Sequence, residues 1–127
     1  MAQSGAAWTP TLCAVLAVPD NASEGARQRA ADHRQRLREL LPLSQRLGVP
    51  VLAGTDVLGT IAREVALLAE HGLGPAAAST AAYRFLGEPF GRPGQPATLV
   101  TYDHDPREDL AVLSSPSAIL IEGVRVR

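Results

Sequence analysis

The tripeptide Gly54-Thr55-Asp56 is the feature of this sequence with the clearest potential for chemistry. It follows a continuous apolar run at residues 49–53, which predicts a strand buried on both faces, as in a parallel sheet covered by helices. The C-terminal ends of such strands form the edge at which α/β proteins place their active sites. An aspartate in this position also serves as a turn or N-cap residue, so both a catalytic and a structural interpretation of Asp56 remain open here.

Other candidate metal ligands are scarce. The single cysteine, Cys13, excludes an internal disulfide and a cysteine-based zinc site. The three histidines, His33, His71 and His104, have neither HxH nor HxxxH spacing. We expect His33 and His104 on the surface and His71 in the last turn of a helix, where its charge would complement the helix dipole. Asp56 alone cannot hold a catalytic metal.

The basic residues are unusual, because all 12 of them are arginine and the chain has no lysine. Within this chain, that excludes a Schiff base, a phosphate-loop lysine and a carboxylated lysine between two metals. Six arginines lie between Arg27 and Arg46 on one predicted helix. This helix could bind an anion or RNA, but its acidic neighbours and the net charge of −1 favour a solvated outer helix.

The composition is that of an ordinary globular domain, and it disfavours a membrane or a nucleic acid as the partner. A length of 127 residues suits one modest core, and no apolar stretch is long enough to span a bilayer. The apolar N-terminal segment has no basic residue before it and contains Pro10, so it does not resemble a signal peptide. With one thiol, the chain fits a reducing cytoplasm.

The predicted elements alternate between strands and helices over the first two thirds of the chain. We expect a break or a kink near Leu41 because Pro42 lies inside the predicted long helix, and Asn21 or Ser23 is a candidate cap for that helix. Gly72 is a stop signal for the helix before it. The expected strands are residues 8–16 and 49–53, and the expected helices are residues 24–47, 60–71 and 75–86.

The last third of the chain has the pattern of an antiparallel sheet. Residues 98–102 predict a strand after a loop rich in glycine and proline. Residues 118–121 and 124–126 predict a hairpin around Glu122-Gly123.

The segment GVPVLAGTD at residues 48–56 resembles the eighth barrel strand of the amidohydrolase superfamily, in particular of its imidazolonepropionase-like and Xaa-Pro-dipeptidase-like members. The segment WTPTL at residues 8–12 resembles its seventh strand, and STAAYRFLG at residues 79–87 resembles a helix of pattern ATxxAAxxLG. The similar segments keep the family's order: residues 8–12, 48–56, 63–68, 71–75, 79–87, 94–100, 103–106 and 121–126.

This resemblance implies an α/β fold, namely the C-terminal fragment of a (β/α)₈ metal-dependent hydrolase barrel followed by part of a small β-sandwich domain. Residues 1–90 would be a partial TIM-barrel segment with strands seven and eight, and residues 91–127 would belong to the composite β domain. Asp56 would be a metal ligand and a catalytic proton shuttle in the hydrolysis of carbon–nitrogen bonds other than ordinary peptide bonds. A divalent metal, with zinc favoured, would activate water toward a small amide or cyclic amide.

The chain also departs from the family. An HxH pair, a carboxylated lysine and two further histidines have no counterpart here, and Thr98 stands where the family has aspartate. Residues 74–78 are shorter than the family's segment by about one helical turn. By resemblance the protein is an enzyme, but we expect this chain alone to hold no metal and to be inactive.

Two other hypotheses come from different classes of protein. The chain could be a non-catalytic remnant or a partner-completing subunit, whose unpaired strand edges bind another chain or a second copy of itself. It could also be an independent small α/β binding module, for which the sequence offers no ligand motif.

Overall fold

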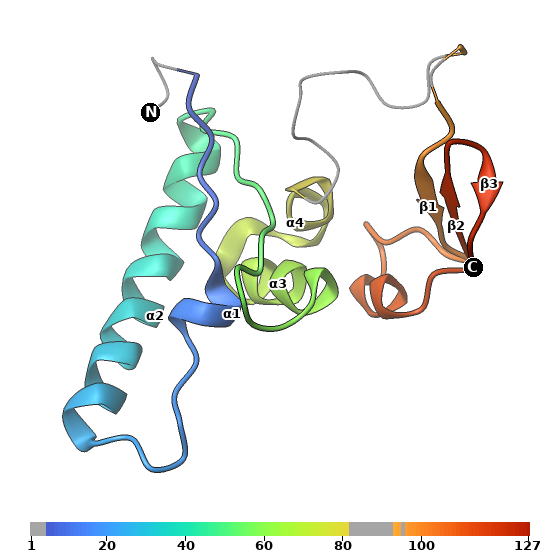
Figure 1. Ribbon diagram of the computed structural model, residues 1–127. Helices are drawn as coiled ribbons and strands as arrows, with labels where there is room; N and C mark the ends of the chain where they lie inside the picture. Colours follow the sequence, from blue (N-terminus) through green and yellow to red (C-terminus); the bar gives the residue numbers. More distant parts are fainter. Residues whose placement is uncertain (1–4, 82–92, 95) are drawn as a thin grey trace.

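The computed structural model describes residues 5–81, 93–94 and 96–127 (Figure 1). A long helix lies along one side of the molecule, shorter helices pack beside it, and a small sheet lies at the other end. In chain order the elements are α1 (Leu12–Val15), α2 (Glu24–Arg46), α3 (Ile61–Leu68), the wide turn η2 (Ala69–Leu73), α4 (Pro75–Ala81), β1 (Leu99–Thr101), the 3₁₀ turn η3 (Leu110–Ser114), β2 (Ala118–Ile121) and β3 (Val124–Arg125).

Helix α2 begins at the predicted cap and continues through the proline that was expected to break it. The Ser23 side chain accepts a hydrogen bond from the Ala26 N–H, which satisfies one of the free donors of the first turn. Pro42 lies inside the continuous helix, so α2 does not break near Leu41. Figure 1 shows α2 as one uninterrupted helix. Leu37 and Leu41 are buried in the core, whereas Leu40 and Leu47 are 47% and 58% exposed.

Helix α1 is held by a carboxylate that lies far away in the sequence. The two oxygens of Glu64 accept hydrogen bonds from the Leu12 N–H at 2.7 Å and the Cys13 N–H at 2.8 Å. Glu64 is fully buried in α3. The backbone donors at the start of α1 therefore find a partner inside the protein in place of water.

Helix α3 starts as predicted, since the Thr60 side chain accepts a hydrogen bond from the Arg63 N–H. Val65 and Leu68 are fully buried, whereas Ile61 is 46% exposed. After α3 the backbone opens into η2 and reverses at Gly72, which has a φ of +100°. The stop predicted at Gly72 is thus confirmed.

Gly72 also lies against the ring of Pro42. A Cβ added at Gly72 would lie 2.9 Å from Pro42 Cγ and 3.8 Å from the Arg38 carbonyl oxygen. Pro42 has no N–H to donate to that carbonyl, so α2 continues but lacks one backbone hydrogen bond here. Gly72 belongs to η2, so the Pro42 ring packs against this turn where α2 lacks the hydrogen bond.

The C-terminal third forms the antiparallel sheet that the sequence predicts. The strands lie in the order β1-β2-β3, with Val100 opposite Ile119 and Ile121 opposite Val124. Glu122 and Gly123 form the turn, both with positive φ, as tight two-residue hairpins require. No residue of the three strands is fully buried.

One core connects the helices to the segment before the hairpin. Leu110 and Leu113 of η3 pack against buried residues of this core, and η3 contacts α3. Each fully buried leucine contributes about 1.5–3 kcal/mol relative to an exposed one. The buried core residues are Leu12, Leu16, Leu37, Leu41, Val65, Leu67, Leu68, Leu73 and Ala78.

The predicted barrel fragment is wrong. The described residues form helices and a three-stranded antiparallel sheet, with no strand ladder of a (β/α)₈ barrel among them. Residues 8–16 and 49–53 meet only at a single parallel bridge between Trp8 and Val51. Local apolar composition suggested a strand at residues 8–16, but capping by Glu64 makes part of it helical.

The predicted helix at residues 75–86 is described only as far as Ala81, where α4 ends. The expected boundary between residues 90 and 91 lies outside the described residues. The resemblance at residues 79–87 also falls largely outside them.

We predict that Glu64→Gln lowers the free energy of unfolding by about 1–3 kcal/mol, since one of two buried N–H donors loses its acceptor. Urea denaturation followed by circular dichroism measures this change. Glu70→Gln is the matched control, because Glu70 is 52% exposed and pairs with Arg63 at the surface. The control should stay within about 0.5 kcal/mol of the parent. Equal losses in both variants would contradict the capping role of Glu64.

We predict that Gly72→Ala destabilises the chain more than Gly48→Ala does. Both glycines have positive φ, which an added Cβ disfavours by roughly 1–2 kcal/mol, but nothing lies within 4 Å of a Cβ at Gly48. The difference between the two variants measures the clash with Pro42. The double variant Pro42→Ala/Gly72→Ala should therefore recover part of the loss; additive losses would show that the ring contact has no effect.

Candidate functional site

Asp56, the residue singled out by the sequence, lies on an exposed turn. Its φ of +56° is uncommon for a residue other than glycine, although aspartate adopts it more readily than most. The turn follows the bridge at Val51, where the Trp8 N–H donates to the Pro50 carbonyl and the Leu52 N–H donates to the Trp8 carbonyl, at 2.8 and 2.9 Å. Asp56 thus lies in a turn five residues after an isolated bridge, and not at the end of the parallel strand predicted for residues 49–53.

The residues around Asp56 do not make a metal site. Among the described residues there is no group of three or more His, Cys, Asp or Glu side chains that could hold a metal ion. His33 and His104 are exposed, and His71 is buried in η2. The donor set of the described chain therefore does not fit a catalytic zinc ion, which needs three protein ligands.

The side chains next to Asp56 are apolar and open to solvent. Val57 is 83% exposed, Leu58 is 48% exposed and Ile61 is 46% exposed. Large apolar side chains exposed close together in the sequence are candidates for a surface that another protein segment or a ligand covers.

A second feature, which we call the arginine pocket, lies between α1, α2 and the α3–η2 segment. It has a volume of about 300 Å³. Its walls carry three guanidinium groups, from Arg34, Arg38 and Arg63, together with one exposed carboxylate, from Glu70. The remaining lining residues are Leu12, Cys13, Leu16, Ala17, Leu67 and His71.

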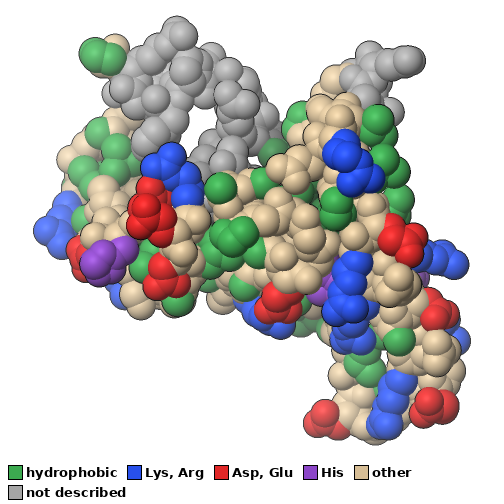
Figure 2. All heavy atoms as spheres, turned by 180° about the vertical axis from the view of Figure 1, so that it is seen from behind, with side chains coloured by type: hydrophobic (Ala, Val, Ile, Leu, Met, Phe, Trp, Pro, Cys, Tyr) green, Lys and Arg blue, Asp and Glu red, His purple; other side chains and the backbone are tan. Residues whose placement is uncertain are grey.

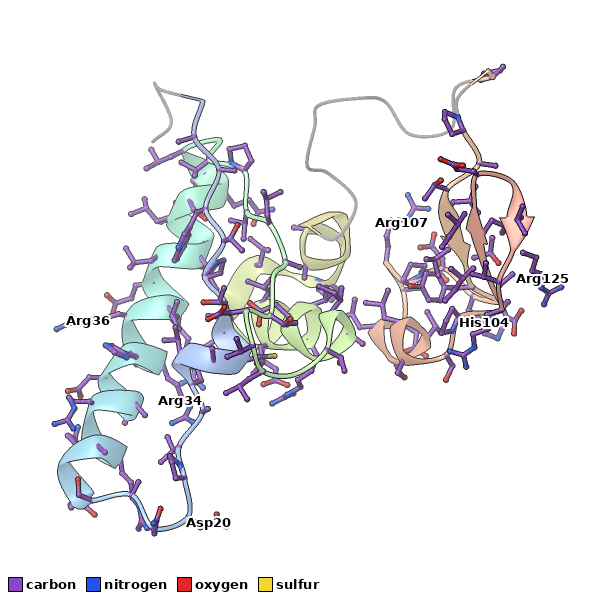
Figure 3. The ribbon with its side chains drawn as sticks, in the orientation of Figure 1. Asp20, Arg34, Arg36, His104, Arg107 and Arg125 are labelled. Atoms are coloured by element: carbon purple, nitrogen blue, oxygen red, sulfur yellow. The ribbon has the colours of Figure 1, made fainter. Side chains whose placement is uncertain are left out.

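Helix α2 positions two of the three arginines. Arg34 and Arg38 are four residues apart and so share one face of the helix. The Arg34 guanidinium donates to the Leu16 carbonyl at 3.2 Å, which ties α2 to the end of α1. Arg63 comes from α3 and pairs with Glu70 at 2.8 Å. Figure 3 shows Arg34 on the side of α2 that faces the rest of the chain and Arg36 on the opposite side.

The turn η2 brings His71 into the same pocket. The imidazole is only 4% exposed, and its Nδ1 lies 2.8 Å from the Leu67 carbonyl oxygen. Because a carbonyl can only accept, Nδ1 must carry the proton in this contact. The other ring nitrogen, Nε2, is buried and has no hydrogen-bond partner among the described residues. His71 therefore lies in the last turn of η2, as the sequence predicted, and its side chain is buried there.

Cys13 is held as a protonated thiol. Burial, a hydrogen bond from the thiol to Glu64 and the negative charge of Glu64 raise the pKa of Cys13, and Arg63 offsets part of this rise. The backbone at Gly59 covers the sulfur, since a Cβ there would lie 2.6 Å from Cys13 Sγ. A thiol with a raised pKa is a poor nucleophile and a poor metal ligand at neutral pH.

The arginine pocket was not predicted as a site. The signal in the sequence was the spacing of Arg34 and Arg38 on a helix that also carries buried leucines. The contribution of Arg63 and His71 depends on how α3 packs, which local patterns do not reveal. Figure 2 shows arginine side chains along the side of the molecule formed by α2, with acidic side chains between them.

Comparisons with known proteins find relatives in mycobacteria. The chain is 32% identical, over 139 aligned positions, to proteins of Mycobacterium tuberculosis strains H37Rv and CDC 1551 and of Mycobacterium bovis, all three described as uncharacterized. The alignments cover 97% of this chain but 37% of each relative, so the chain spans little more than a third of their length. No family model matches the chain, and no solved structure matches it significantly.

The described part of the chain contains no helix that is both long and apolar enough to cross a membrane.

We predict that Cys13 reacts slowly with iodoacetamide near pH 8, because its raised pKa lowers the thiolate fraction at any given pH. Glu64→Gln removes the charge that raises this pKa, so the folded variant should react faster than the parent. The alkylation rate followed by mass spectrometry over a pH series tests this. The unfolded chain in urea gives the reference rate, and a native rate equal to it would contradict the prediction.

Proposed function

We propose that this chain contributes Asp56 to a larger metal-dependent hydrolase that acts on carbon–nitrogen bonds other than ordinary peptide bonds. The observation that carries the proposal is the place of the Asp56 carboxylate, which is exposed on a positive-φ turn five residues after the Trp8–Val51 bridge. The resemblance of residues 48–56 to an amidohydrolase strand supports it. The substrates would be small amides or cyclic amides, and the favoured compartment is the cytoplasm.

The remaining metal ligands must come from residues outside the described chain. One carboxylate cannot fix a metal ion, and the described residues offer no cluster that completes the set. The mycobacterial relatives are much longer than the matched segment, so proteins of this type have room for further ligands. The chain by itself would then be inactive.

A second candidate function is that of a partner-completing subunit without chemistry of its own. It is favoured by the exposure of large apolar side chains on several elements and by a sheet in which no strand residue is fully buried. Such surfaces are typical of segments that another chain covers. The exposed large apolar residues are Val15, Leu40, Leu43, Leu47, Val57, Leu58, Ile61, Val100, Ile121, Val124 and Val126.

We predict that the purified chain, supplied with zinc, manganese or cobalt, hydrolyses neither cyclic amides nor N-acylated amines above the metal blank. The full-length Mycobacterium tuberculosis relative, assayed on the same panel, should show turnover that a chelator removes. Turnover by the isolated chain that Asp56→Asn abolishes would contradict the predicted inactivity. A full-length relative that binds no metal and hydrolyses none of the panel would contradict the hydrolase itself.

Size-exclusion chromatography with light scattering separates the second candidate from the first. A partner-completing subunit should self-associate, or bind a separately produced remainder of a relative. A compact monomer with cooperative unfolding, and no binding to that remainder, would rule it out.

A further inference from the structure

The arginine pocket has an excess of positive charge. Three guanidinium groups line it, and the one carboxylate in its wall, Glu70, already pairs with Arg63. Arg34 and Arg38 are like charges four residues apart, an arrangement that disfavours an isolated helix. The structure gives the Arg38 guanidinium no hydrogen bond or ion pair among the described residues. Among the described residues, the guanidinium groups of Arg34 and Arg38 therefore have no negatively charged partner.

The imidazole of His71, which is among the residues that line the pocket, adds a second, independent observation. Its Nδ1–H donates to the Leu67 carbonyl, and its Nε2 is buried without a hydrogen-bond partner among the described residues. Buried polar atoms in folded proteins nearly always have a hydrogen-bond partner. A ligand oxygen would supply one: a neutral ring accepts a hydrogen bond from a hydroxyl group, and a cationic ring donates one to an oxyanion.

From these features we propose that the arginine pocket binds a small molecule bearing a carboxylate or a phosphate group. The guanidinium fork matches both oxyanions in geometry and charge. Leu12, Leu16 and Leu67 give the pocket an apolar part that suits a short carbon skeleton. Its volume of about 300 Å³ lies at the small end of the range of roughly 300–1,000 Å³ for ligand pockets.

The shape of the site favours a small anion over RNA. A nucleic-acid surface needs a continuous basic track, whereas acidic residues alternate with the arginines of α2 and the chain carries a net charge of −1. The pocket also draws its arginines from two different helices, α2 and α3, around one concave space. This proposal is independent of the hydrolase proposed above, because Asp56 does not line the arginine pocket.

Isothermal titration calorimetry tests the proposal with two probes, inorganic phosphate and succinate, at pH 7 and low ionic strength. We expect saturable binding with one-to-one stoichiometry for at least one probe, and the tighter probe identifies the oxyanion class. Arg38→Gln should weaken binding by about tenfold or more, the loss expected for a charged hydrogen-bond partner. Arg36→Gln removes the same charge from the other face of α2 and should change the affinity by less than twofold.

The three histidines provide a readout that needs no mutation. In an imidazole ¹⁵N–¹H spectrum, the His71 signals should shift on titration with the probe, and the fitted Kd should equal the Kd from calorimetry. His33 and His104 do not line the arginine pocket, so their signals should stay unchanged.

Two outcomes would overturn the proposal. One is the absence of a saturable His71 shift with both probes. The other is equal weakening by Arg36→Gln and Arg38→Gln, which would mean diffuse attraction to a basic helix. In that case a single-stranded RNA oligomer should bind with the same sensitivity to both variants.

Discussion

The contact between the Glu64 carboxylate and the start of α1 determines how the N-terminal half of this chain is arranged. Without it, the donors of Leu12 and Cys13 would be buried near an apolar core with no acceptor. With it, α1 is fixed against α3, Leu12 and the C-cap residue Leu16 enter the core, and the chain that follows leads into α2. Burying a carboxylate costs free energy unless its oxygens are hydrogen-bonded, and both oxygens of Glu64 accept hydrogen bonds here.

The same contact shapes the wall of the arginine pocket. It holds Cys13 and Leu12 at the pocket and keeps the thiol protonated beside them. The Pro42–Gly72 approach packs η2, which carries His71, against α2. The two arrangements together place residues from α1, α2, α3 and η2 around one space.

Local signals in the sequence predicted the features that depend on local hydrogen bonds. Ser23 and Thr60 begin helices and Gly72 ends one because these side chains and conformations act within a single turn. The turn at Glu122-Gly123 was predicted for the same reason, because its conformation depends on these two residues. The helix at Leu12 could not be found this way, since its cap comes from a residue more than fifty positions away. Nor could the continuity of α2 through Pro42, which coincides with the packing of a distant glycine.

The small C-terminal sheet has a consequence for the stability of the molecule. Its strands share hydrogen bonds but bury no residue fully, and its link to the core is the apolar face of η3. Regions with few buried contacts open at a lower free energy than the core does. Amide hydrogens of β1–β3 should therefore exchange in a faster class than those of α3, and proteases should find this end of the chain first. The native protein would then have two levels of local stability: helices that stay folded, and a hairpin that opens and closes independently of them.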